Sequence, residues 1–196
     1  MKKYLLLSLV SMFSLFISAQ TTTWKNDPAH SRLGFVVKHL TISEVEGYFS
    51  DFSAEVVTSK ADYSDMKIKV TAKIASVNTG VEMRDNHLKS ADFFDAEKYP
   101  EMVFSSTKVV KLASKGTTQY GKIYGTLTFH GITKPAVLDV KYYGKVVNPM
   151  NNAETVGFKV TGSVSRKDFD LGPKFPEAMI SDKITINTNL EFSPQK

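Results

Sequence analysis

The sequence predicts an all-β protein of roughly eight antiparallel strands, arranged as a barrel or a sandwich. Apolar and polar residues alternate with a period of two in one segment after another, which is the pattern of half-buried strands. The connections between these segments are short, and none resembles the crossover helix that a parallel sheet requires. One irregular segment near residues 82–98 interrupts the alternation.

The alternation is clearest at residues 66–74, where apolar side chains occupy every second position and lysine or threonine stands between them. A glycine inside the segment 44–57, Gly47, is typical of a bulge or a sharp bend in a coiled strand. The other segments with this pattern are 33–37, 44–57, 102–112, 119–130, 136–143, 158–164 and 184–192.

The irregular segment is expected to hold a short helix inserted between strands. Val81, Arg84 and Leu88 fall at helical spacing. The same segment contains many charged side chains, a histidine and aromatic residues. This composition is typical of an active site, but also of a segment that closes the end of a barrel.

The chain of 196 residues is long enough for one well-buried domain, which we expect at residues 21–196. Residues 1–20 have the pattern of a cleaved signal peptide, because Lys2 and Lys3 precede a short apolar run that ends in small residues. A membrane anchor would need about 20 continuous apolar residues, and this run is shorter. The protein is therefore expected to be periplasmic or secreted.

Charge and cysteine content narrow the function classes further. Removal of Lys2 and Lys3 lowers the formal charge from +5 to +3, and the remaining lysines are spread along the polar faces of strands. We therefore expect no nucleic-acid partner. The chain has no cysteine, so an exported fold must rely on core packing alone.

Alternation alone does not separate an inward-facing barrel from an outer-membrane barrel, whose apolar face is turned to lipid. Phe35, Phe129 and Phe158 lie within strands, whereas membrane barrels concentrate aromatic residues at strand ends. Strongly unequal loops are also missing. These observations favour the inward-facing barrel, with no stable insertion into a membrane.

Ten short motifs, in this order along the chain, resemble those of the YceI-like family, also described as polyisoprenoid-binding or lipid-binding. They are Asp27-Pro28-Ala29-His30-Ser31, Val37-Lys38-His39-Leu40, Val45-Glu46-Gly47-Tyr48-Phe49, Ser76-Val77-Asn78-Thr79, Arg84-Asp85-Asn86-His87-Leu88, Phe93-Phe94-Asp95, Tyr99-Pro100, Phe104-Ser105-Ser106, residues 125–135 and Arg166-Lys167-Asp168-Phe169. Asp170 stands where members of the family often carry glycine, which puts the local turn in doubt.

The resemblance implies an extended, lipocalin-like eight-stranded barrel that binds a ligand and does not turn it over. The ligand would be a long-chain amphiphile (a polyprenyl lipid, an isoprenoid quinone or a fatty amide) held for transport, storage or sequestration. No other cofactor is expected, and a homodimer is left open. The residues expected to line the tunnel are Phe35, Val37, Phe49, Ile68, Val70, Phe104, Leu127, Phe129, Leu138, Val140, Phe158, Val160 and Ile186.

The polar cluster and the histidines leave two interpretations open. Arg84, Asp85 and His87 either contact the ligand head group at the barrel mouth or fix the geometry of a turn, with Asp85 capping it and Arg84 bonded to a loop carboxylate. The four histidines either form hydrogen bonds with backbone or carboxylate groups that fix the ends of strands, or they are functional groups of a metalloprotein or hydrolase, which is the alternative function. No paired metal-ligand spacing and no Gly-x-Ser-x-Gly nucleophile motif is present, so we expect neither a metal site nor catalytic residues.

Overall fold

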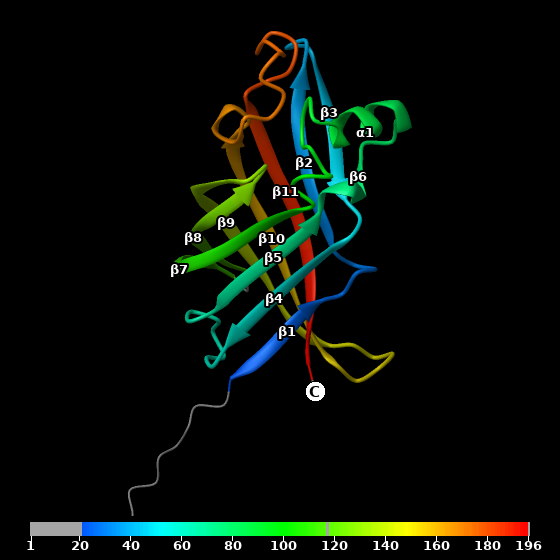
Figure 1. Cartoon of the computed structure of the whole chain (residues 1–196). Coiled ribbons are helices and arrows are strands. Elements are labelled where there is room, and N and C mark those ends of the chain that lie inside the picture. Colours follow the sequence, from blue (N-terminus) through cyan, green and yellow to red (C-terminus); the bar gives the residue numbers. More distant parts are fainter. Residues whose placement is uncertain (1–20, 117, 196) are drawn as a thin grey trace, which may run out of the picture.

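The computed structural model describes residues 21–116 and 118–195, and β-strands dominate it (Figure 1). The predicted signal peptide at residues 1–20 lies outside the described residues. The strands are β1 (Thr22–Asn26), β2 (Arg32–His39), β3 (Ser43–Phe49), β4 (Phe52–Thr58), β5 (Lys67–Lys73), β6 (Val77–Asn78), β7 (Glu101–Lys115), β8 (Thr118–Phe129), β9 (Ile132–Val147), β10 (Glu154–Ser165) and β11 (Lys183–Pro194). The helices are α1 (Glu82–Lys89) and the short 3-10 turns η1 (Ile74–Ser76) and η2 (Lys167–Phe169).

Eight of these strands close into an antiparallel barrel. Neighbouring strands follow the order β1, β4, β5, β7, β8, β9, β10, β11, and β11 pairs in turn with β1. The closing contact is short, because it joins Trp24–Asn26 of β1 to Phe192–Pro194 of β11. The predicted eight-stranded lipocalin-like barrel is therefore confirmed.

The first half of β11 has a different neighbour. Residues 185–189 pair with β2, which continues through β3 to the two-residue strand β6. This extension carries the sheet beyond the closed barrel toward α1, at the upper end in Figure 1. The turn between β9 and β10 and the C-terminus lie at the lower end. The two ends of the barrel are thus built differently.

Three local details differ from the sequence-based expectations. Segment 44–57 is two strands, because the chain turns at Ser50–Asp51. Of the bulge or sharp bend expected at Gly47, the bulge is absent, since β2 and β3 pair through Gly47 without a shift in register. The helical insertion is shorter than residues 82–98, because α1 ends at Lys89 and turns follow it.

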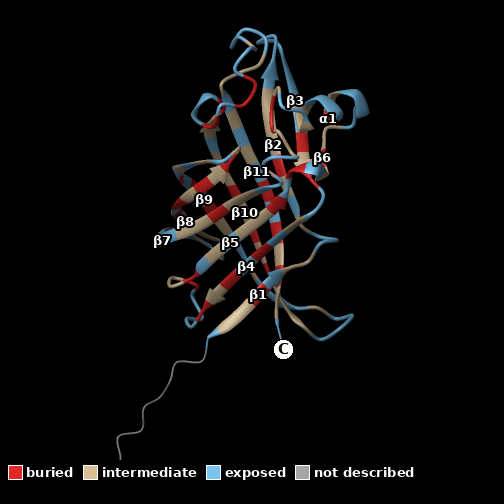
Figure 2. Ribbon diagram, viewed as in Figure 1, coloured by how far each residue is buried: buried red, intermediate tan, exposed pale blue. Residues whose placement is uncertain are grey.

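The apolar side of the alternation faces the barrel interior. In β9, for example, Ala136, Leu138 and Val140 are buried, whereas Val137 and Asp139 between them are exposed. Figure 2 shows the same alternation of buried and exposed positions along the strands. None of the helices in the described part of the chain is long and apolar enough to cross a membrane.

Candidate ligand cavity

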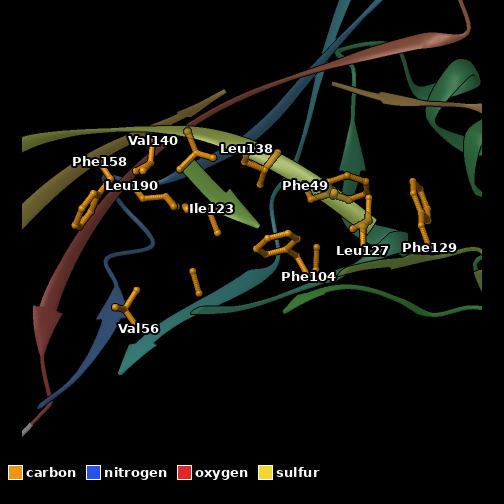
Figure 3. Close-up of a cluster of buried hydrophobic side chains, with 14 of the residues drawn as sticks. Phe49, Val56, Phe104, Ile123, Leu127, Phe129, Leu138, Val140, Phe158 and Leu190 are labelled. Atoms are coloured by element: carbon orange, nitrogen blue, oxygen red, sulfur yellow. The ribbon is translucent and has the colours of Figure 1, made fainter. Parts of the chain in front are cut away.

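The barrel interior is not filled by its own side chains. It holds a cavity of about 420 Å³ whose wall is made almost entirely of aliphatic and aromatic residues. Several of them gather in the interior in Figure 3, including Phe104, Ile123 and Leu190. A concave, mostly apolar space of this size lies within the usual range for small-molecule sites.

All thirteen residues expected to line the tunnel lie on the cavity wall. Their contact with a ligand stays a prediction. The wall also contains apolar residues that were not singled out beforehand, and some of these share strands with the predicted ones. The additional strand residues are Leu33, Val45, Val56, Met102, Ile123, Ala136, Val164, Ile184, Leu190 and Phe192, and Met66 just before β5 also lies on the wall.

Two aromatic side chains on the wall are seated on glycines. A Cβ added at Gly47 would lie 2.4 Å from Cζ of Phe35, and one added at Gly125 would lie 2.6 Å from Cζ of Phe104. The ring therefore occupies the space that a side chain would fill on the neighbouring strand. These glycines keep Phe35 and Phe104 against the wall and leave the space beyond the rings open.

Aromatic residues close the end of the barrel opposite α1. Tyr63, in the turn between β4 and β5, is buried, and its ring centroid lies 5.9 Å from that of Trp24 on β1. On its other side it lies 5.4 Å from Tyr142 on β9 and 5.9 Å from Phe158 on β10. Burial raises the pKa of the Tyr63 hydroxyl, so this group is neutral. Phe158 also lines the cavity and thus forms its floor.

At the other end, α1 places polar groups beside the cavity. The Nε and Nη2 atoms of Arg84 donate hydrogen bonds to the hydroxyl (2.7 Å) and carbonyl (2.9 Å) of Thr79. Asp85 is buried and accepts hydrogen bonds from the backbone N–H and hydroxyl of Thr79, so it caps the turn before the helix. Arg84 and His87 line the cavity, whereas Asp85 does not.

This arrangement corrects part of the alternative interpretation of the cluster. Asp85 does cap a turn, but the groups that hold Arg84 are a hydroxyl and a carbonyl of Thr79, and no loop carboxylate bonds to it in the described residues. The Arg84 guanidinium therefore keeps further N–H groups for another acceptor.

The segment between η2 and β11 forms a second side of the mouth. The ring of Phe175 stacks on that of Phe93 at 4.7 Å, and the His87 ring lies edge-on to Phe93 at 5.0 Å. Asp92 accepts a hydrogen bond from Lys174 at 2.9 Å and lies 3.5 Å from His87. The Lys174 ammonium holds the pKa of the Asp92 carboxyl below its usual range.

Arg166 organises this segment from inside. Its side chain is only 3% exposed and donates hydrogen bonds to four backbone carbonyls, those of Leu171, Gly172, Phe175 and Ile180. It also lines the cavity. Sequence reasoning missed Arg166 as a wall residue, because an arginine in a polar motif is usually exposed.

The four histidines lie in separate surroundings. His30 is 3.0 Å from Asp27, His87 faces Asp92, and Nδ1 of His130 is 3.1 Å from the carbonyl of Phe169. His39 lies at the end of β2, on the cavity wall. Across residues 21–116 and 118–195, no group of three or more metal-ligating side chains converges. The geometry of these residues therefore gives no support to a histidine-based metal site.

The fold and the cavity together define a class: an antiparallel barrel with a closed aromatic floor, an apolar interior and a polar mouth. Comparison with known sequences then identifies the family. The model of the YceI-like domain matches residues 24–192, so the chain belongs to the YceI-like family.

Individual relatives agree with this assignment. A UPF0312 protein of Staphylococcus aureus is 34% identical over 171 residues, which cover 87% of this chain and 94% of the relative. The crystal structure of the Campylobacter jejuni YCEI protein matches with a TM-score of 0.69 and 36% identity, covering 81% of this chain and 90% of that one.

A third comparison concerns the fold alone. A polyisoprenoid-binding domain from Saccharophagus degradans, implicated in plant cell wall breakdown, has a TM-score of 0.64 at 16% identity. The match covers 88% of this chain and 98% of that domain.

Proposed function

We propose that this protein is an exported binding protein that holds one long-chain amphiphile in its barrel, for transport, storage or sequestration. A polyprenyl lipid, an isoprenoid quinone and a fatty amide are the ligand types considered. The observation that carries the proposal is the apolar cavity of about 420 Å³ with a floor at one end and polar groups at the other. The polyisoprenoid-binding domain with the same fold supports a lipid-like ligand.

Burial of a hydrocarbon chain supplies enough free energy for such binding. Each methylene group moved from water into an apolar site contributes about 0.8 kcal/mol. A chain with about ten buried methylene groups would therefore gain roughly 8 kcal/mol before the entropy lost on association is subtracted. Specific polar contacts are not needed for the tail, so the wall can be as uniformly apolar as it is.

The wall also favours binding over turnover. In the part of the chain that the structure describes, no aspartate or glutamate lies on the wall, and the sequence has no cysteine. An enzyme that acts on the ligand would need a nucleophile with a general base beside it. His39 and His87 could serve as bases on the wall, but among the described residues no serine lies there with them. The proposed periplasmic or secreted location rests on the signal-peptide pattern at residues 1–20.

Titration with a fluorescent fatty acid tests the proposal. cis-Parinaric acid gains fluorescence when it moves from water to an apolar site. We expect saturable binding of one probe per chain at micromolar concentrations or below, and displacement by polyprenols, by a long-chain quinone or by a fatty amide. A correctly folded, delipidated protein that binds neither the probe nor any of these competitors would disprove the proposal.

A further inference from the structure

One hydroxyl group on the cavity wall has no hydrogen-bond partner. Thr188 lies on β11, lines the cavity and is only 2% exposed. Its Oγ1 atom forms no hydrogen bond with any of the described residues. The other wall hydroxyl in this part of the chain belongs to Thr79, and it is in use, because it donates to Asp85 and accepts from Arg84. Thr188 therefore offers a free hydrogen-bonding group inside the barrel.

The side chains around Thr188 are hydrocarbon. Across the sheet it pairs with Val160 of β10 and with Leu33 of β2, and both of these residues line the cavity. Along β11, its neighbours on the same face are Ile186 and Leu190, which also line the cavity. The protein thus surrounds the hydroxyl with apolar groups on every side except the one that faces the open space.

The other unpaired polar atoms in the described residues differ from this one. They are Nε1 of Trp24, Nδ2 of Asn26 and Nε of Arg166. Trp24 and Asn26 lie on β1 and are not on the cavity wall. Arg166 is on the wall, but its other two nitrogens already donate to four backbone carbonyls. Thr188 is the wall residue whose whole polar group is left over.

A threonine at this position makes the empty barrel less stable than a valine would. The two side chains have nearly the same shape, and an unpaired buried hydroxyl is less favourable there than a methyl group. A residue that breaks a packing rule without a gain for folding is typical of a functional site. The partner that the protein does not supply can come from a ligand in the cavity.

The position of Thr188 along the strand sets the depth of this partner. Ile184, near the mouth, follows directly on the segment that ends at residue 181, and Phe192 packs on Phe158 of the floor with their ring centroids 5.9 Å apart. Thr188 stands four residues after Ile184 and four before Phe192. Each interval corresponds to about 13 Å along the strand. The free hydroxyl therefore lies about midway between the mouth and the floor.

We infer that the bound amphiphile carries an oxygen function, a hydroxyl or a carbonyl group, near the middle of its buried part, and that Thr188 forms a hydrogen bond with it. A threonine hydroxyl can donate to either kind of oxygen, so the two share one recognition chemistry. A plain hydrocarbon at this depth leaves the Thr188 hydroxyl unpaired. A site that bonds a ligand oxygen discriminates strongly against the analogue that lacks it. This inference rests on the proposed function and makes Thr188 a residue that determines specificity.

Three fatty acids of one chain length test the inference. They are octadecanoic acid, 10-hydroxyoctadecanoic acid and 2-hydroxyoctadecanoic acid, and their affinities are measured by displacement of cis-parinaric acid from the delipidated protein. The 10-hydroxyl group lies near the middle of the chain whichever end enters first. We expect the 10-hydroxy acid to bind at least threefold tighter than octadecanoic acid. The 2-hydroxy acid should have no such advantage, because its hydroxyl lies beside the carboxyl group at the end of the chain.

Thr188→Val shows whether this hydroxyl is responsible. The affinity ratio of the 10-hydroxy acid to octadecanoic acid should fall at least tenfold, which corresponds to about 1.4 kcal/mol, because the ligand hydroxyl is then buried without a partner. Thr188→Ser keeps a hydroxyl and should keep the preference. Thr185→Val is the matched control, since Thr185 lies on the same strand but is exposed and is not on the cavity wall. It should leave the ratio unchanged.

The outcomes separate the inference from the proposed function. Equal affinity of the unmodified protein for octadecanoic acid and the 10-hydroxy acid would overturn the inference and leave the proposed function standing. A preference that survives in Thr188→Val, or that is lost equally in Thr185→Val, would also overturn it, because the hydroxyl of Thr188 would not be its source. Failure of the folded protein to bind any of the three acids would overturn the proposed function and the inference with it.

Discussion

Replacing Ala136 with phenylalanine should block the cavity while leaving the barrel around it intact. Ala136 lies on β9, its side chain is 8% exposed, and it is part of the cavity wall. The strand residue paired with it is Gly125, so no side chain faces it there from β8, although the Phe104 ring lies over that glycine. A larger side chain at this position can enter the empty space.

The size of the effect follows from the volume taken from the ligand. The ring adds six carbon atoms to a cavity of about 420 Å³. It would exclude about four to six methylene groups of a bound chain, and at about 0.8 kcal/mol each this removes roughly 3–5 kcal/mol of binding free energy. Because about 1.4 kcal/mol corresponds to a tenfold change, affinity should fall by about two to three orders of magnitude.

The assay is titration with cis-parinaric acid, accompanied by thermal unfolding to show that the variant is folded. Val137→Phe is the control, because Val137 is the next residue of the same strand but faces outward and is 46% exposed. It should bind the probe as the unmodified protein does. A folded Ala136→Phe variant with unchanged affinity would refute the assignment of this cavity as the ligand site.

Three further predictions concern stability and protonation. Thr188→Val should raise the free energy of unfolding by about 1–2 kcal/mol in urea titrations, because the Thr188 hydroxyl is buried without a hydrogen-bond partner. A lower free energy of unfolding would show that this hydroxyl does have a hydrogen-bond partner. Asp170 has a left-handed backbone (φ 54°). Asp170→Gly should therefore leave the free energy of unfolding nearly unchanged, and Asp170→Val should lower it by about 1–2 kcal/mol. Equal effects of the two substitutions would contradict this explanation. His30 and Asp27 share a hydrogen bond that raises the pKa of the histidine above 6.5 and lowers that of the aspartate below 3.8. The pair therefore stabilises the fold most between these values, and its contribution disappears as pH rises through the folded His30 pKa or falls through that of Asp27. NMR titration of His30 should show the raised pKa, and Asp27→Asn should lower it, with the charge of Glu191 still raising it.

Most of the barrel could be predicted because half-buried strands show a simple alternation of apolar and polar residues in the sequence. Apolar residues at every second position mark the inner face, and the predicted wall residues all lie on that face. The same signal failed at Ser50–Asp51, where two strands follow each other without a strong turn motif. It also gave no indication of β6, which has only two residues.

The two ends of the barrel could be predicted much less well. The segment 166–181 has no periodicity, and its shape depends on the buried guanidinium of Arg166 and its bonds to the carbonyls of Leu171, Phe175 and Ile180 within the same segment. The aromatic floor depends on Tyr63, whose turn has a left-handed backbone (φ 57°) that a sequence pattern does not reveal in tyrosine. In both places, specific side-chain contacts that leave no periodic pattern in the sequence decide the structure.

The central claim is that the cavity holds one long-chain amphiphile. Native mass spectrometry of the protein isolated from its own cells tests this most directly. The account predicts a complex heavier than the bare chain by the mass of a single lipid, which organic extraction removes and total lipid from the same cells restores. A folded protein that has the bare mass in every preparation, and that stays bare after incubation with those lipids, would contradict it.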